Sequence, residues 1–290
     1  MTIKSILVSL DGTDSGLATL ETGLMVAAKF KAHADALHVR PDSLTAVPAI
    51  GDAMNGEMAE NFSQGHQSEH DERSKAARAM FEAACLRRNI RVVEGGPTPD
   101  GLSASFLDRV GQPHAVMCRL GRVHDLVVVG QPSHPKDMLR SLTIDALFQT
   151  GRPVLVVPKA VPKSLGKVIA IGWNGSAECA RAIGGATNFF SQAEKVVVLT
   201  AESEHTPKTV IPELVSYLQC HGVKVETRII GQMGKAHLGG HQLLAAAEVE
   251  QADLLVMGAK LEKNKVKRMF LGCATSDVLN SARIPLLMGH

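Results

Sequence analysis

Aromatic residues, excess charge and long apolar runs are all scarce in this chain of 290 residues. It contains one Trp, one Tyr and eight Phe, so an aromatic platform for stacking bases is not expected. The formal net charge of +2 argues against nucleic acid as the main partner, because binding to a phosphate backbone normally requires a strong basic excess on one face. No apolar run approaches the roughly 18 residues that cross a membrane. We therefore expect neither nucleic acid nor membrane as a partner.

Paired cysteines are also lacking. The five cysteines are scattered and none forms a CxxC pair, which is typical of thiols that are buried as small apolar groups in a reducing compartment. The apolar stretch before Asp11 is too short for a secretory signal, so we expect a cytoplasmic protein. The cysteines are Cys85, Cys118, Cys179, Cys220 and Cys273.

Strand-like and helix-like segments alternate along the chain, which predicts an α/β protein with parallel sheets. The length suggests two domains of about 145 residues each. Residues 41–70 have weak periodicity and are expected to form a long excursion. His66, His70 and Asp71, in and next to this excursion, are expected to be solvated. In the first half we expect strands at 3–10, 34–39, 90–93, 125–129 and 153–157, and helices at 14–31 (capped by Asp14 or Ser15), 72–88, 102–120 and 138–150.

The pattern of landmarks occurs twice. Asp11-Gly12-Thr13 matches Asn174-Gly175-Ser176 at an offset of 174 − 11 = 163. The run 125–130 matches 253–258 at an offset of 128, and 153–155 matches 285–287 at an offset of 132. These spacings predict a duplicated α/β unit, with the extra residues of the first half lying mostly in 41–70.

The last 38 residues contain a candidate anion site. A buried strand is expected to end at Gly258, and a helix is expected to begin near Gly272, Cys273 and Thr275. Free N–H groups at a helix start attract anions, and the intervening lysines supply matching charge, so an oligophosphate would suit this loop. The cationic residues of the loop are Lys260, Lys263, Lys265, Lys267 and Arg268.

Three segments together resemble the universal stress proteins, and the chain resembles two such domains in tandem. The segments are 6–13 (ILVSLDGT), 253–259 (DLLVMGA) and 270–275 (FLGCAT). The resemblance implies two open, Rossmann-like, five-stranded parallel sheets of strand order 3-2-1-4-5, one in residues 1–160 and one in residues 161–290. It also implies that the last strands, 153–157 and 285–288, pair with each other, which would make an intramolecular pseudo-dimer.

Some members of that family bind ATP, and the resemblance implies where ATP (with Mg²⁺) would lie in this chain. A strand-one acid lies near the adenine, and a glycine-rich loop leads to a helix that holds the phosphates. The matching positions in the second half are Asn174, Gly258, Lys260, Gly272, Cys273 and Thr275, and those in the first half are Asp11, Gly130, Ser141 and Thr143.

Both halves depart from the family's loop. In the second half Leu261 replaces the middle glycine, and Leu lacks the freedom to adopt positive φ. Cys273 replaces the hydroxyl residue, and a thiol is a weak donor. In the first half Arg140 replaces the last glycine, and the loop after Gly130 contains two prolines, which remove backbone donors. The second half is therefore the better candidate for phosphate binding.

Several other interpretations of these residues remain open. The lysines after Gly258 could form a solvated face, and Asp11 could cap the following helix. Cys273 could be a reactive thiol, because a helix start and nearby lysines lower thiol pKa values. His237 and His241 lie four residues apart, but no third metal ligand is evident.

Three classes of function follow. The first is a cytoplasmic stress-response protein that binds an adenine nucleotide with little or no turnover, and that forms a homodimer. The second is an interaction module of the same fold that does not bind nucleotide. The third is an adenylating enzyme of the ATP-pyrophosphatase group, whose loop reads SGGxDS; the segment 9–15 (SLDGTDS) matches it only faintly, because Leu10 stands at the second position.

Overall fold

The fold is described here from a computed structural model, which covers residues 2–41, 56–94, 101–132, 137–202, 210–232, 238–263 and 269–290. The first half contains β1 (Ser5–Ser9), α1 (Asp14–Phe30), β2 (His33–Arg40), α3 (Gly56–Arg87), β3 (Ser103–Val110), α4 (Pro113–Gly121), β4 (Leu126–Gly130), α5 (Met138–Gln149) and β5 (Val154–Val157).

The second half repeats this order and adds a hairpin. It contains β6 (Val168–Trp173), α6 (Ala177–Phe190), β7 (Lys195–Glu202), α7 (Val210–Cys220), β8 (Val225–Gln232), α8 (Leu238–Val249), β9 (Leu254–Gly258), β10 (Leu261–Lys263), β11 (Met269–Leu271), α9 (Cys273–Ser281) and β12 (Leu286–Gly289). The expected boundary at residues 160–161 falls in the connection between β5 and β6.

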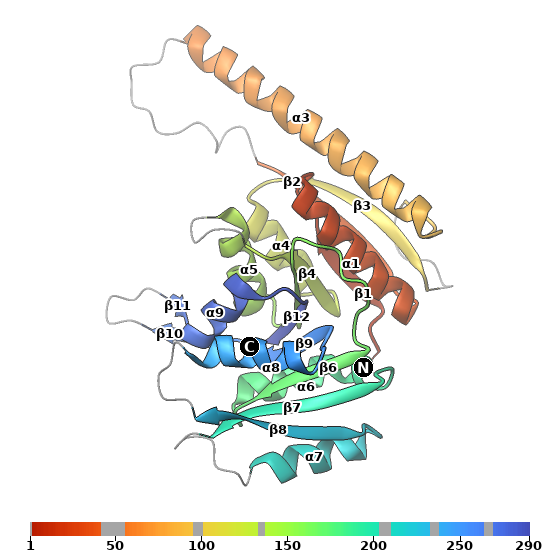
Figure 1. Ribbon diagram of the computed structural model, residues 1–290. Coiled ribbons are helices and arrows are strands. Elements are labelled where there is room, and N and C mark those ends of the chain that lie inside the picture. Colours follow the sequence, from red (N-terminus) through yellow and green to blue (C-terminus); the bar gives the residue numbers. More distant parts are fainter. Residues whose placement is uncertain are drawn as a thin grey trace.

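The strands form one ten-stranded sheet of order β3-β2-β1-β4-β5-β12-β9-β6-β7-β8 (Figure 1). Each half has the predicted order 3-2-1-4-5, and its strands are parallel. At the centre β5 and β12 run antiparallel, with Leu155 opposite Leu287. The prediction of two tandem α/β units that pair through their last strands is therefore confirmed.

The strands are apolar on both faces because helices cover both sides of the sheet. Ile6 and Val8 of β1 belong to one core with α1, α3, α6 and α7, whereas Leu7 faces the other core with α4, α5, α8 and α9. Each core contains residues of both halves. Phe30 of α1 meets Phe189 of α6 edge to face at 4.8 Å between ring centroids. The two units therefore share their cores rather than each enclosing its own.

A pair of aspartates shows the duplication at atomic detail. Asp125 precedes β4, and its Oδ2 accepts hydrogen bonds from the backbone N–H groups of Lys4 (2.8 Å) and Ser5 (3.1 Å). Asp253 precedes β9 in the same way, and its Oδ1 accepts from the N–H groups of Lys167 (2.9 Å) and Val168 (3.1 Å). Each carboxylate satisfies backbone donors at the start of the first strand of its half.

The third strand of the first half was assigned wrongly from the sequence. Residues 103–110 form β3, where a helix over 102–120 was expected, and α4 begins only at Pro113. Leu102, Phe106 and Val110 are spaced four apart, which imitates a helical stripe. In the structure Phe106 packs against one core and Leu107 against the other, as the two faces of a strand require. The expected strand at 90–93 makes only a bridge from Val92 to Ala104.

The helix that precedes β3 is longer than expected. It begins at Gly56 rather than near residue 72, so residues 56–70 are helical and not an irregular excursion. Apolar residues are few in this stretch, so its sequence pattern does not predict a helix with a buried face. Figure 1 shows α3 projecting past the rest of the first half. The remainder of the expected excursion, residues 42–55, lies outside the described residues.

The cationic segment after β9 also differs from the expected plain loop. Leu261–Lys263 and Met269–Leu271 pair as a short antiparallel hairpin, with Leu261 opposite Leu271. Leucine at the middle-glycine position is thus compatible with the observed extended backbone. Lys265, Lys267 and Arg268 lie outside the described residues.

Within the described ranges, no helix combines the length and the apolar character that crossing a bilayer requires.

Candidate functional site

Two cavities lie at corresponding places in the two halves, at the carboxyl ends of the parallel strands. The cavity of the first half has a volume of about 370 Å³ and lies at the ends of β1 and β2, beneath α3, α4 and α5. The cavity of the second half has a volume of about 230 Å³ and lies at the ends of β6 and β9, beside the start of α9. Ligands of open α/β sheets occupy this edge.

Five of the six residues that the sequence suggested for the second half line one cavity. They are Asn174, Gly258, Lys260, Gly272 and Thr275. The sixth, Cys273, is the first residue of α9, and its side chain is outside what the structure describes.

The start of α9 faces this cavity without a side-chain cap. Gly272 is the N-cap residue and provides no side chain to accept the N–H groups of the first helical turn. Thr275 is buried, and its Oγ1 accepts a long hydrogen bond of 3.4 Å from the backbone N–H of Lys260. Because the first N–H groups of a helix lack intrahelical partners, this end of α9 can receive an anion.

The opposite wall is the turn that follows β6. Asn174 Oδ1 accepts from the N–H of Ser176 at 3.1 Å and from the thiol of Cys179 at 3.0 Å. Glu178 also lines the cavity, and its pKa lies below the usual value, chiefly because its own N–H at the start of α6 donates to the carboxylate. Arg181 pairs with this carboxylate at 3.5 Å. The turn is therefore ordered by its own contacts.

The first-half residues are more dispersed. Asp11 lines the larger cavity, whereas Gly130 lies in a small recess beside it. Thr143 is buried, and its hydroxyl donates to the carbonyl of Leu139 at 2.7 Å. Ser141 is exposed on α5. Neither of the last two is among the described residues that line the larger cavity.

This difference arises because α5 begins earlier than α9. With the offset of 132 between the halves, Cys273 at the start of α9 corresponds to Ser141, since 273 − 132 = 141. However, α5 already begins at Met138. The N–H groups of Ser141 and Thr143 therefore lie inside the helix, where the i→i−4 pattern uses them. The N-cap is Asp137, whose Oδ1 accepts from the N–H of Leu139 at 3.1 Å. A carboxylate thus occupies the place that a phosphate would need.

The helix α1 likewise begins with its own cap. Thr13 is the N-cap, and its Oγ1 accepts from the N–H of Gly16 at 3.3 Å; the expected caps, Asp14 and Ser15, lie inside the helix. Asp11 supports this turn rather than capping the helix, because its Oδ1 accepts from the N–H (3.0 Å) and the hydroxyl (2.7 Å) of Thr13.

Arg140, which stands where the family's last glycine was expected, reaches across to the second half. Its guanidinium donates to Asn280 Oδ1 at 2.9 Å and to Ser276 Oγ at 3.0 Å, both on α9. Gln131 donates to the carbonyl of Leu279 at 2.8 Å. The loop and helix start that would hold phosphates in the first half instead hold α9 of the second.

No family model matches the chain, and no curated protein matches it either. Among solved structures, a universal stress protein from Archaeoglobus fulgidus DSM 4304 is similar over 99% of this chain and 98% of that chain, with 15% identity and a TM-score of 0.68. The chain has the tandem universal stress protein fold. A functionally unknown protein from Pseudomonas aeruginosa PAO1 is similar over 98% of this chain and 92% of that chain, at 16% identity and a TM-score of 0.54.

A candidate universal stress protein from Pseudomonas aeruginosa UCBPP-PA14 gives the same coverage of 98% and 92%, at 16% identity and a TM-score of 0.55. At identities of this size the likeness extends to the tandem universal stress protein fold and not to the residues of a site.

Several residues of both cavities were missed from the sequence. Cys179 contacts Asn174. The offset of 163 that aligns Asn174 with Asp11 also aligns Cys179 with Gly16, so the internal repeat could have indicated that Cys179 lies beside the site. His38 and Met117 line the first-half cavity with Asp137, but no motif distinguishes them. His70, expected to be solvated, also lines it, and Asp71 pairs with Arg40 at 3.0 Å.

Metal ligands are not gathered in the part of the chain that the structure describes: it contains no group of three or more His, Cys, Asp or Glu that could hold an ion. His241 lies on α8, whereas His237 is outside the described residues.

Proposed function

We propose that this protein binds an adenine nucleotide in its second half, where the start of α9 holds the phosphates, and that it serves in the stress response. The observation that carries the proposal is the contrast between the two helix starts. The first turn of α9 faces a cavity with Gly272 as its N-cap, whereas α5 is capped by the Asp137 carboxylate.

The surroundings of α9 support this assignment. Lys260 lies at the rim and adds a positive charge to the favourable end of the helix dipole. The deeper lining is apolar and includes Leu199, Leu243 and Met257, which suits the flat face of a base. Adenine itself comes from the resemblance to ATP-binding members of the family.

We propose that occupancy of this site, rather than turnover, is the output. A stress-response role follows from the fold shared with the universal stress protein of A. fulgidus. A cytoplasmic location and a homodimer belong to the same proposal, and light scattering of the purified chain would test the second.

A second candidate is an interaction module of this fold that takes no nucleotide. Two observations favour it. A Cβ at Gly258 would lie 2.6 Å from the N atom of Cys179 and 2.8 Å from the carbonyl carbon of Glu178, so packing alone explains this glycine. Asn174 Oδ1 already has two donors within the turn.

Titration with ATP and Mg²⁺ decides between these candidates. We expect wild-type protein to bind and, at ATP about 1,000-fold above Kd, to gain about 4 kcal/mol of stability. Lys260→Gln and Thr275→Val should each weaken binding roughly tenfold, since each removes a charge or hydroxyl at the phosphates. Thr143→Val, the matching change in α5, should leave the affinity unchanged. No heat and no change in melting temperature at millimolar ATP would favour the interaction module.

A further inference from the structure

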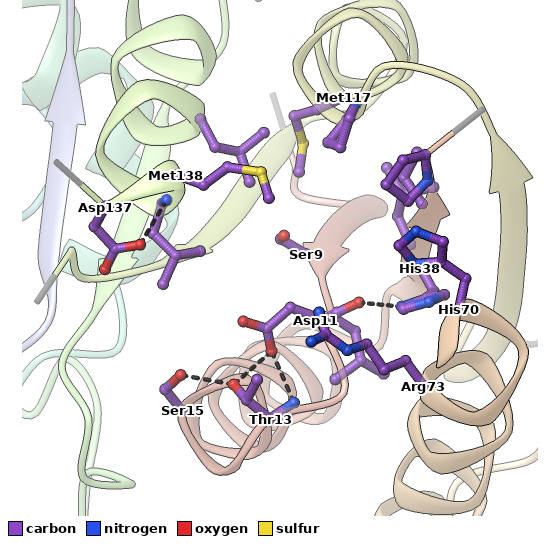
Figure 2. A pocket seen from close by; sticks show the side chains of 17 residues that line it. Ser9, Asp11, Thr13, Ser15, His38, His70, Arg73, Met117, Asp137 and Met138 are labelled. Carbon is purple, nitrogen blue, oxygen red and sulfur yellow. Dashed lines mark hydrogen bonds between the residues drawn. The ribbon is translucent and has the colours of Figure 1, made fainter. Parts of the chain in front are cut away.

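The cavity of the first half is the larger of the two described above and has the character of a small-molecule site (Figure 2). Its volume of about 370 Å³ lies within the range of roughly 300–1,000 Å³ that is typical of such sites. Most of the lining is apolar, and two methionines provide adaptable surface on the walls formed by α4 and α5. The apolar side chains that the argument uses are Leu37, Met117, Met138 and Leu142.

His38 lines this cavity. The ring is 5% exposed, and its Nδ1 lies 2.9 Å from the carbonyl oxygen of Leu10. Because a carbonyl oxygen only accepts, Nδ1 carries a proton. Phe106 lies nearly parallel to the ring, at 6.5 Å between centroids and 14° between planes. The ring is therefore a fixed part of the cavity wall.

Asp11 presents an acceptor to this cavity. Its Oδ1 is used by Thr13, whereas none of the described residues donates to Oδ2. Gly16 keeps the space for this carboxylate, because a Cβ there would fall within 2.3 Å of Oδ1. The carboxylate is therefore held in one orientation with one oxygen available.

The charge of the described lining is negative. Asp11 and Asp137 contribute two carboxylates and Arg73 one guanidinium, which gives these three groups a formal charge of +1 − 2 = −1. Figure 2 shows Asp11 and Asp137 on different elements around the cavity. A ligand that donates hydrogen bonds and carries positive charge complements this arrangement.

We propose that the first-half cavity binds a small, largely apolar molecule that carries a protonated amine, with the ammonium donating to Asp11 Oδ2. The apolar body lies against the methionines and leucines. Anionic ligands are disfavoured, because the Asp137 carboxylate caps α5 and the N–H groups of Ser141 and Thr143 are used within the helix. This site is separate from the proposed phosphate site and does not depend on it.

Calorimetric titration of the whole chain tests the proposal with phenethylamine and hexylamine as probes. Phenethyl alcohol serves as the neutral analogue and hydrocinnamate as the anionic one. We expect both amines to bind, and the alcohol and the anion to bind at least about tenfold more weakly, since they lose the charge-assisted contact. Absence of binding by both amines at millimolar concentration, or equal affinity for amine and alcohol, would overturn the proposal.

Variants locate the binding. Asp11→Asn keeps the shape and removes the charge, so it should weaken amine binding about tenfold or more. Asn174→Ala, at the corresponding position of the second half, should leave it unchanged.

Met138 is 65% exposed, so Met138→Lys adds a cation to the cavity wall with little risk to folding. It should abolish amine binding, whereas Met138→Gln should not. Equal binding by Met138→Lys and Met138→Gln would refute the assignment.

Discussion

Asp35 is the centre of a buried polar cluster at the amino ends of β2 and β3. Its carboxylate accepts from His33 at 3.1 Å, from His124 at 3.0 Å and from Ser105. Burial alone would raise the pKa of Asp35, but these hydrogen bonds outweigh it and hold the pKa far below its usual value. The second nitrogen of His33 lies 2.8 Å from Ser103 Oγ. The cluster thus ties β2 to β3 and to His124, which lies in the connection between α4 and β4.

The lowered pKa of Asp35 gives stability a defined pH dependence. A carboxyl whose folded pKa is depressed stabilises the fold above its unfolded pKa of about 3.9, and this stabilisation is lost as pH falls towards the folded pKa. We expect Asp35→Asn to cost about 2 kcal/mol or more at pH 7, because two buried rings lose their ionised partner. The difference from wild type should shrink below about pH 4. Urea unfolding across pH measures it.

Asp71→Asn is the matched control for this measurement. Asp71 is 47% exposed and has one ion pair, with Arg40, so its loss should cost less than about 1 kcal/mol at any pH. A difference between wild type and Asp35→Asn that stayed constant from pH 7 to pH 3 would show that the ionised carboxylate is not the stabilising species.

The cysteines should differ strongly in reactivity. Burial, and then the charges of Glu21 and Glu82, raise the pKa of Cys85 to about 12. Burial also raises the pKa of Cys118, whereas Cys220 is exposed on α7. Because the thiolate is the reactive form, we expect iodoacetamide at pH 8 to modify Cys220 in the native protein and to spare the other two. Peptide mass spectrometry measures the extent of alkylation at each cysteine. Denatured protein, in which all three cysteines react, is the control. Alkylation of native Cys85 at the rate of Cys220 would contradict it.

At the scale of elements, the strands next to the sheet centre were the easiest to predict. β1, β4, β5 and β9 are continuous apolar runs bounded by polar or glycine residues, and they are buried on both faces. β3 was missed because Ser103 and Ser105 interrupt its apolar pattern, and both are buried in polar contacts instead. Burial of polar residues depends on partners distant in sequence, which a local pattern does not contain.

In the candidate sites, too, residues that follow a local sequence pattern were predicted, and residues that act through distant partners were not. The strand, loop and helix pattern of the last 38 residues predicted Gly258, Gly272 and Thr275 as neighbours, because strand ends and helix starts meet at one edge of such a sheet. It did not predict the role of Arg140. That residue was recognised only as a missing glycine, and its partners, Ser276 and Asn280, lie more than a hundred residues away on α9.

The contact between α5 and α9 leads to a prediction for both stability and binding. Arg140→Ala removes two hydrogen bonds to α9, the helix whose start is the proposed phosphate site. We expect a loss of about 1–2 kcal/mol in the free energy of unfolding. We also expect weaker ATP binding by a few fold, because α9 is less firmly positioned. Urea unfolding and ATP titration measure the two effects independently.

Arg109→Ala is a suitable control, since Arg109 is exposed and its guanidinium donates to the backbone carbonyl of its own neighbour, Asp108. It should change neither quantity. If Arg140→Ala lowered stability but left ATP affinity intact, α9 would be positioned by its own half alone.

At the scale of the whole molecule, the two halves are joined by more than the chain connection. The sheet is continuous through β5 and β12, and both cores cross that junction. On the same junction Lys29 of α1 donates to the carbonyl of Leu165 at 2.9 Å. An exposed edge at β5 or β12 would be a liability for either half alone, because unpaired strand edges associate.

The shared sheet and cores predict that the two halves unfold together, and the chain carries a natural probe in each. Trp173, the only tryptophan, lies at the end of β6 and reports the second half through its fluorescence. Cys85 is 1% exposed in the first half and reports through its accessibility to a thiol reagent. We expect both signals to change at the same urea concentration with one cooperative transition. Exposure of Cys85 at a distinctly lower concentration than the change at Trp173 would show instead that each half unfolds by itself, and that the central β5–β12 pairing contributes little to its neighbours.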